Sequence, residues 1–373
     1  MVVFDVSKKW VIIVPPGAAL AARACADLSR YIGLLAEADR GSLSGKPFHS
    51  PEITDAENSS SYESVIVLNS DDEASLKNGF SWRAKPDRIE IFGESGRGLC
   101  NGIYCFLSAL GISWPVPGQE KLPVRASGDS GVSSKGQSSG FYLEHGSVYE
   151  PSKNDGSDSA GISLRRFVPA GRKEIKYILK NCEDFAAWAA RRRYDTAVFP
   201  LAFFASESKK KKLNSLKKYL AEYGILLEAG GRDLSALVPR KYFFLHRDSF
   251  RMEEGRRKRA HHFCPTNPGT TRIIGIEGGK MFRAAEDVSL FHLWPDKGAE
   301  AAWCSCPTCR AFTPQEQYRI GVSAAADVLA SINPGASITF LEKAGEDIKI
   351  PLRKNISSIE KLPEEKEFNT SAR

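Results

Sequence analysis

The chain has 373 residues, a formal net charge of +7, 42% hydrophobic residues and 26% charged residues. This balance is typical of a globular protein and excludes wholesale disorder, and the apolar runs are too short to span a bilayer. The length favours two domains, because single cores stop growing near about 250 to 300 residues. Because the apolar runs are so short, we expect no membrane partner. No secretory signal pattern is visible, so we expect a cytoplasmic protein.

The first predicted domain is an α/β sandwich over residues 1–118, with its strands covered on one side by two helices. Short apolar runs with β-branched residues predict its strands, and apolar residues at helical spacing predict its helices. The expected strands are 10–14, 64–70 and a hairpin of 80–84 with 88–92, and the expected helices are 21–35 and 99–110. The turn "GESGRG" reads as a tight strand-to-helix connection in which Arg97 is placed to pin the domains together.

Residues 119–139 are rich in Ser and Gly, as is typical of a linker, and strand-then-helix units follow them. The expected strands are 140–149, 195–201, 224–231, 288–294 and 336–342, with helices at 174–192, 215–223, 270–285 and 316–332. Such alternation predicts a parallel sheet and, continued, a TIM-type (β/α) barrel. About five of eight units fit into residues 140–355 before a polar tail at 356–373, so we predict an incomplete barrel whose open edge a partner or second copy covers.

Reactive groups in such barrels cluster at the carboxyl ends of the strands, where this sequence has several acids. Glycoside hydrolysis uses paired carboxylates, and aromatic rings stack on sugars, although each acid alone could be a solvated loop residue and each aromatic ring a core residue. The candidate catalytic residues are Asp296, Glu342 and Glu228. The candidate substrate-binding residues are His145, Arg232, Asp233, His292 and Trp294.

The stretch "CSCPTC" combines two cysteine spacings, of which C-x-x-C recurs in tetrahedral zinc sites. Its three cysteines need a fourth ligand, and Cys264 is the best candidate, with His261 and His262 as substitutes. We therefore predict a structural zinc site made by Cys264, Cys304, Cys306 and Cys309. Free thiols packed under a loop are the alternative, which the local spacing favours equally. A redox dithiol is disfavoured because no thioredoxin-like strand leads into a helix at the C-x-x-C.

Two dense basic runs, at residues 208–212 and 253–259, raise the question of a nucleic-acid partner. No aromatic-interleaved or helix-turn-helix pattern accompanies them, so we interpret them as solvated surface and expect no nucleic-acid partner.

The stretch "RIEIFGESGRGLCNGIYCFLSALGISWPVPG" resembles the non-catalytic α/β domain that precedes the barrel in bacterial α-glucuronidases and β-hexosaminidases. The stretches "LEAGGRDLSALVPRKYFF", "FCPTNP" and "HLWPDKGAEAAWCSCPTCRAF" are similar to an uncharacterised barrel family that occurs joined to that module. The resemblance implies a glycoside-hydrolase-like fold and a carbohydrate partner but supplies no catalytic residue. Relatives are usually longer, and many have a histidine where Arg232 stands.

Two functions follow as expectations. The first is a truncated glycoside hydrolase that cleaves O-glycosyl bonds by acid/base chemistry at its strand-end carboxylates, if it is active. The second is a catalytically inactive protein that binds a carbohydrate or another partner.

Overall fold

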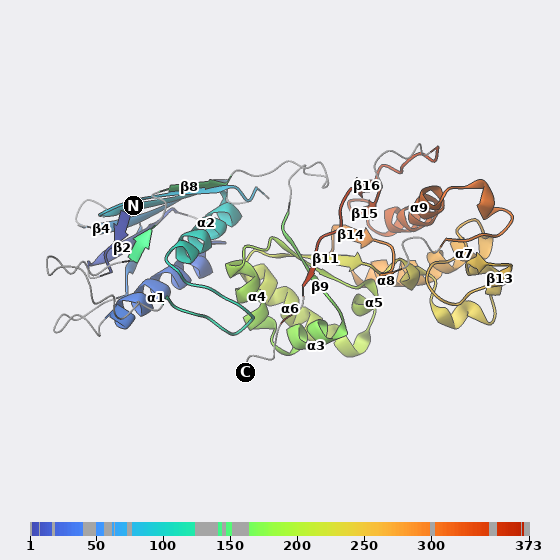
Figure 1. The fold of residues 1–373 in the computed structure, drawn as a ribbon, viewed down its shortest axis with the longest axis horizontal. Helices are drawn as coiled ribbons and strands as arrows, with labels where there is room; N and C mark the ends of the chain where they lie inside the picture. Colours follow the sequence, from blue (N-terminus) through green and yellow to red (C-terminus); the bar gives the residue numbers. More distant parts are fainter. Residues whose placement is uncertain are drawn as a thin grey trace, which may run out of the picture.

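The computed structural model describes residues 2–6, 8–16, 19–39, 50–55, 62, 64–72, 77–123, 141–143, 147–150, 164–298, 303–342, 349–366 and 368. Two α/β regions follow each other along the long axis of the molecule (Figure 1). The first is built on a six-stranded sheet and the second on a seven-stranded sheet. Among the described residues, no helix has both the length and the apolar character that crossing a membrane requires.

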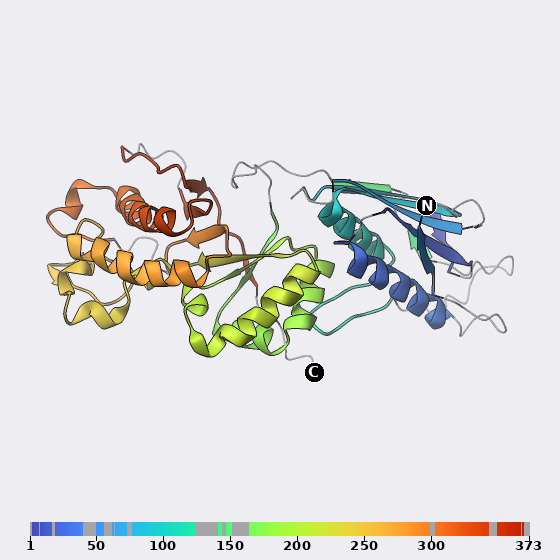
Figure 2. The same ribbon diagram turned by 180° about the vertical axis from the view of Figure 1, so that it is seen from behind.

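The N-terminal sheet has the strand order β3-β2-β4-β6-β5-β8. Its strands are β2 (Trp10–Val14), β3 (Glu52–Asp55), β4 (Ser64–Asp72), β5 (Phe80–Lys85), β6 (Arg88–Ser95) and β8 (Ser147–Glu150). The β5–β6 pair is the hairpin that the sequence predicts. Helices α1 (Ala22–Asp39) and α2 (Gly96–Ala109) cover one face of the sheet, as Figures 1 and 2 show from opposite sides.

The turn from β6 into α2 needs small residues. A Cβ atom at Gly93 would lie 2.0 Å from the backbone nitrogen of Leu99, so only glycine fits there. The Ser95 side chain caps α2 by accepting a hydrogen bond from the Gly98 backbone N–H at 3.1 Å. The turn thereby fixes the position of Arg97 in the first helical turn.

The described parts of the predicted first barrel strand (140–149), residues 141–143 and 147–149, pair instead with N-terminal strands. Strand β7 (Phe141–Leu143) pairs antiparallel with β1 (Val2–Phe4), and β8 pairs antiparallel with β5. The prediction was wrong because an apolar run does not reveal its pairing partner, and hydrogen bonding to an N-terminal edge decides it. The first strand of the second sheet is β9 (Arg166–Pro169), only four residues long and missed from the sequence.

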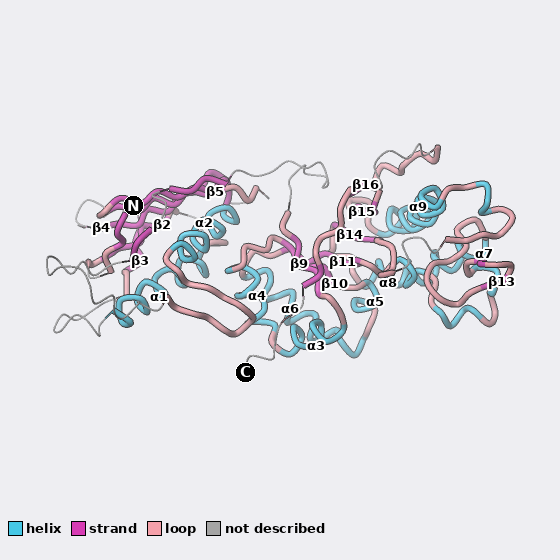
Figure 3. The backbone as a smooth tube through the Cα atoms, in the orientation of Figure 1, coloured by secondary structure: helices cyan, strands magenta, loops and turns pink. Residues whose placement is uncertain are grey.

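The second sheet is parallel throughout and has the order β16-β15-β14-β11-β10-β9-β17. Its other strands are β10 (Thr196–Phe199), β11 (Leu226–Gly231), β14 (Leu290–Leu293), β15 (Ser337–Leu341), β16 (Ile356–Ile359) and β17 (Glu365–Lys366). The strands cross the middle of the molecule (Figure 3). Parallel pairing with intervening helices is the arrangement that the sequence predicts for this half.

The chain path shows that this sheet curls. Strands β16 and β17 lie at its opposite edges, yet only five residues, 360–364, connect them. Seven strands laid flat would put the two edges about 29 Å apart, at about 4.8 Å a strand. The connection reaches about 20 Å at most when fully extended. The sheet therefore bends toward a barrel, with β17 beside the first strand, β9.

The predicted polar tail, residues 356–373, contributes two of these strands. The side chains of Ile356 and Ile359 are both 8% exposed, and Phe368 stacks on Phe167 with ring centroids 5.7 Å apart. The tail prediction was wrong because its apolar residues are few and widely spaced, so neither strand nor helix periodicity is visible in the sequence.

The helices of the second region are α3 (Arg172–Lys180), α4 (Cys182–Arg191), α5 (Leu201–Phe204), α6 (Lys210–Glu222), α7 (Pro268–Ile273), α8 (Gly279–Ala284) and α9 (Pro314–Ile332). The helix predicted over 174–192 is broken at Asn181, whose φ of −129° and ψ of 53° are not helical. A π-helical turn (Ile274–Gly278) joins α7 to α8. Thr313 and Glu316 begin α9 with a reciprocal capping box.

The two regions are joined by polar contacts, one partly buried and one buried. The Arg191 guanidinium donates to both carboxylate oxygens of Asp27, at 2.9 and 3.0 Å. Arg97 donates to the backbone oxygen of Asp195 at 2.6 Å, as its place in the turn suggests. Asp195 lies directly before β10, so the N-terminal region is fixed to the amino end of the parallel sheet.

Candidate functional site

A buried polar network occupies the interior of the curled sheet. Its centre is Glu228 on β11, which is 3% exposed. One carboxylate oxygen, Oε2, accepts hydrogen bonds from Arg166 Nε at 2.9 Å and Thr196 Oγ1 at 3.1 Å, and lies 2.9 Å from His292 Nε2. These groups come from four consecutive parallel strands, so the sheet curvature is what brings them together.

The network continues to the fifth strand. His292 Nδ1 lies 2.6 Å from Thr339 Oγ1, and Trp294 Nε1 donates to the same hydroxyl at 3.2 Å. Burial raises the pKa of Glu228, but His292, Arg166 and Thr196 outweigh it and the net pKa is lowered. An ionised carboxylate only accepts hydrogen bonds, so His292 Nε2 carries a proton here. Glu228 and the Arg166 guanidinium thus form a charged pair in the sheet interior.

Two further acids meet at the carboxyl edge of the sheet. Asp233 follows β11 and Asp296 follows β14, and these strands are neighbours. Asp296 accepts a hydrogen bond from the Ser235 backbone N–H at 3.1 Å and lies 3.8 Å from the Arg240 guanidinium. Asp233 Oδ2 is buried and has no hydrogen-bond partner among the described residues.

The environment of Asp233 favours its neutral form. Burial raises the pKa of Asp233 to about 7, and the charge of Asp296 adds to the rise. Backbone N–H groups of Leu201 and Ala202 oppose it without cancelling it. A carboxyl group that holds its proton near neutral pH beside a second carboxyl group is the pattern of acid/base pairs.

Two other predicted site residues form ion pairs of their own. Glu342, after β15, forms an ion pair with Arg319 of α9, which also donates to the backbone oxygen of Ile350. Arg232 forms an ion pair with Glu365 of β17 at 3.2 Å. His145 lies outside the described residues. Arg166, Thr196 and Thr339 were missed from the sequence because they lie inside short strands rather than after them.

The four predicted cysteines come together in one buried cluster. Their sulfur atoms all lie within 4.8 Å of one another, and Cys264 Sγ is 3.7 Å from Cys306 Sγ and 3.6 Å from Cys309 Sγ. Cys304 Sγ accepts a hydrogen bond from the Met252 backbone N–H at 3.2 Å. Hydrogen bonds from Cys304 and Cys309 lower the pKa of Cys264, which favours a thiolate. This donor set is one that can hold a metal ion.

His262 takes no part in the cluster. Its ring stacks on Trp303 with centroids 4.5 Å apart. Cys264 therefore supplies the fourth sulfur atom of the cluster.

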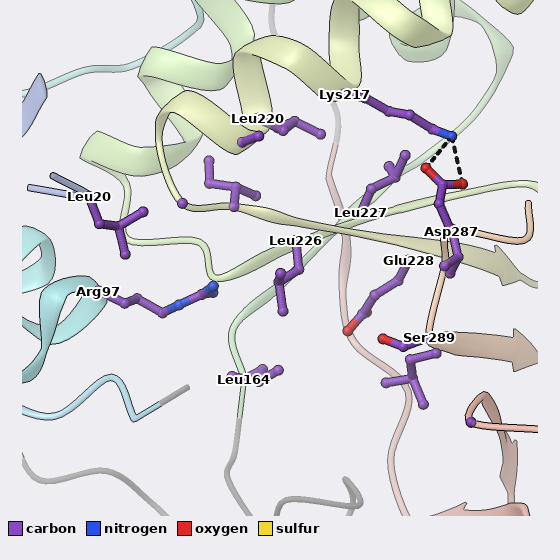
Figure 4. A pocket seen from close by; sticks show the side chains of 16 residues that line it. Leu20, Arg97, Leu164, Lys217, Leu220, Leu226, Leu227, Glu228, Asp287 and Ser289 are labelled. Carbon is purple, nitrogen blue, oxygen red and sulfur yellow. Dashed lines mark hydrogen bonds and ion pairs between the residues drawn. The ribbon is translucent and has the colours of Figure 1, made fainter. Parts of the chain in front are cut away.

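A cavity of about 550 Å³ lies at the opposite, amino end of the parallel strands (Figure 4). Six of the sixteen residues that line it are leucines, and Arg97, Glu228 and the Lys217–Asp287 ion pair line it as well. The cavity and the Asp233–Asp296 pair are thus at different ends of the sheet. Figure 4 shows the Arg97 side chain extending from α2 toward this cavity.

Solved structures show what this fold is similar to. The chain aligns with Flavobacterium johnsoniae chitobiase (TM-score 0.54, 12% identity) over 91% of its own length and 50% of that chain. It aligns with a GH20 exo-β-N-acetylglucosaminidase from Vibrio harveyi (TM-score 0.50, 10% identity) over 95% of its own length and 54% of that chain. No family model and no curated protein sequence matches it. The fold is glycoside-hydrolase-like, and the chain spans about half the length of these enzymes.

Proposed function

We propose that this protein acts on a carbohydrate and that Asp233 and Asp296 are its acid/base pair. The observation that carries the proposal is the position of the two carboxyl groups at the carboxyl ends of β11 and β14, with Asp233 Oδ2 buried and the pKa of Asp233 raised to about 7. The glycoside-hydrolase-like fold supports it, because that edge of a β/α sheet is where active sites form.

The roles follow from the two environments. Asp233 would donate its proton to the oxygen of the scissile glycosidic bond as that bond breaks. Asp296, held by the Ser235 N–H and facing Arg240, would accept a proton from water or attack the sugar carbon. Glu342 stays a predicted third acid at the same edge, but its ion pair with Arg319 makes it a weaker choice.

A panel of chromogenic aryl glycosides tests this proposal. Asp233→Asn and Asp296→Asn should each lower the turnover of a cleaved glycoside by about a hundredfold or more. Glu342→Gln, at the same edge, is the matched comparison and should retain most activity. Circular dichroism and thermal unfolding establish that each variant folds. Full turnover by folded Asp296→Asn would exclude Asp296 from the site.

The second candidate function is carbohydrate binding without hydrolysis. The observation that favours it is the Arg240 guanidinium, 3.8 Å from Asp296, which competes for the carboxylate that catalysis needs. Saturable binding of a glycan by the wild type, with no cleavage of any glycoside in the panel, would select this function over the first.

We also propose that the cysteine cluster holds a structural zinc ion. Four thiolates at zinc–sulfur distances of about 2.3 Å would place sulfur atoms about 3.8 Å apart, close to the 3.6 and 3.7 Å that Cys264 makes with Cys309 and Cys306. Four protein ligands close the coordination sphere, so the role is structural. Such an ion would tie the segment after β11 to the segment after β14. Elemental analysis of purified protein should give one zinc per chain.

A further inference from the structure

The net positive charge of the protein is concentrated in one segment. Residues 240–261 contain eight lysines and arginines against three acidic residues, a surplus of five charges where the whole chain has +7. The segment connects β11 to the cysteine cluster and includes the short hairpin of β12 (Met252–Glu253) and β13 (Arg256–Arg257). It lies at the end of the molecule opposite the N-terminal sheet (Figure 1).

The same segment exposes two adjacent apolar side chains. Phe244 is 79% exposed and Leu245 is 84% exposed, the two highest values for large hydrophobic residues in the described part of the chain. Scattered exposed hydrophobic residues are normal, but two neighbours this exposed in a strongly basic segment form a patch.

Cations lie beside Phe244 and beside the residue that precedes it. The Arg259 guanidinium lies 5.6 Å from the ring centre of Phe244, and Arg247 lies 5.6 Å from that of the preceding Phe243. Lys241 lies in the preceding helical turn (Arg240–Phe243), pairs with Glu277 at 3.2 Å, and has a side chain that is 62% exposed. We call Lys241, Phe244, Leu245, Arg247 and Arg259 the basic tip.

The basic tip stands on an ordered base. Phe250 and Phe263 are each 1% exposed and pair across an isolated β-bridge. Cys264 donates its backbone N–H to the Ser249 oxygen at 2.9 Å, and the Met252 backbone N–H donates to Cys304 Sγ at 3.2 Å. The cysteine cluster therefore holds the base in place. Because the base is already ordered, binding through Phe244 and Leu245 does not first have to order it.

We propose that the basic tip binds an anionic lipid surface, with Phe244 and Leu245 entering the interfacial layer and the cations contacting the headgroups. Aromatic and aliphatic side chains beside lysines and arginines are the chemistry that such surfaces recognise. A soluble polyanion needs only the cations and gives no reason to expose Leu245. The expectation of no membrane partner rested on the lack of a spanning segment, which does not bear on surface binding.

Vesicle co-sedimentation of the full chain tests this proposal. Wild-type protein should bind phosphatidylcholine vesicles that contain phosphatidylglycerol, bind pure phosphatidylcholine weakly, and lose binding at high salt. The Phe244→Ser/Leu245→Ser variant should bind anionic vesicles at least about tenfold more weakly than the wild type. The two apolar side chains that would enter the lipid are lost, while the charge is unchanged.

A charge-matched pair of variants separates the basic tip from net charge. Lys241→Gln/Arg247→Gln/Arg259→Gln should abolish binding to anionic vesicles. The control Lys210→Gln/Lys211→Gln/Lys212→Gln removes the same charge from the exposed start of α6 and should bind as the wild type does. Circular dichroism verifies that each variant is folded.

Two results would overturn the proposal. One is equal loss of binding in both charge variants, which would indicate attraction to the net charge alone. The other is unchanged vesicle binding by Phe244→Ser/Leu245→Ser together with tight binding of heparin or DNA, which would indicate a polyanion site.

Discussion

Asp296 accepts a hydrogen bond from the Ser235 backbone N–H at 3.1 Å, and this contact joins the end of β14 to the turn that carries Asp233. The two acids are 63 positions apart in the sequence, from 233 to 296. This hydrogen bond attaches the turn that follows Asp233 to the side chain of Asp296. Substitutions at Asp296 should therefore also change the position of Asp233.

The pH dependence of stability should report on Asp233. Its pKa is 3.8 in an ordinary environment and about 7 in the folded protein. As the pH rises from about 4 to about 7, the unfolded chain loses this proton while the folded chain keeps it, so this group lowers stability over that window. Denaturant unfolding across this range should show a smaller decline for Asp233→Asn than for the wild type.

The pKa shift of Asp233 limits how much stability this group can remove. The shift corresponds to at most about 4 kcal/mol, at about 1.4 kcal/mol for each pKa unit. Glu207→Gln, at a carboxylate whose side chain is 88% exposed, is the control and should follow the wild-type curve. Parallel curves for Asp233→Asn and the wild type would contradict the raised pKa.

Replacing Glu228 should destabilise the protein strongly. Glu228→Gln leaves the Arg166 guanidinium, whose side chain is 7% exposed, without its ionised partner. Breaking one side of a buried ion pair typically lowers stability by about 3 to 5 kcal/mol. Chemical denaturation of Glu228→Gln, Arg166→Met and the double variant measures the coupling. The double variant should lose less stability than the two single losses added together, and simple additivity would contradict a coupled pair.

Replacing one cysteine of the cluster should lower the stability of the second region. Cys306→Ser removes one of four sulfur ligands, so zinc content and the thermal unfolding midpoint should both fall, and a strong chelator should destabilise the wild type in the same way. Cys105→Ser, at a half-buried cysteine of α2 outside the cluster, is the control. A wild type without metal, whose unfolding a chelator leaves unchanged, would show that the cluster is made of packed thiols.

The contact between the two regions should depend on Arg191. Its guanidinium binds both oxygens of Asp27, and the two side chains are 17% and 13% exposed. Arg191→Met should therefore lower stability by about 1 to 3 kcal/mol and speed proteolysis at the junction. Arg353→Met is the matched control, since it removes an exposed Arg–Asp pair within the second region. Equal proteolysis rates for both variants would show that the junction does not rest on Arg191.

The sequence by itself determined the elements with strong local signals. Helical periodicity located α1, α2 and α9, and short apolar runs located β2, β5 and β6. The C-x-x-C spacing identified the cysteine cluster, including its distant member Cys264, because tetrahedral coordination requires four donors. The strand-end rule predicted that Asp233 and Asp296 follow strands, and they follow β11 and β14, since the rule depends only on where an apolar run stops.

Only the tertiary structure decided which strands pair and which acids share an environment. Strand β9 and the strands of the 356–373 segment are too short to show periodicity, and the partners of residues 140–149 are set by distant hydrogen bonds. The sequence predicts Glu228 and Glu342 as catalytic residues and Asp233 as a substrate-binding residue without showing the environment of any of them. The structure distinguishes them: Glu228 lies in a buried charged network, Asp233 lies near a second acid, and Glu342 pairs with Arg319. These differences depend on distances across the fold, which the sequence does not show.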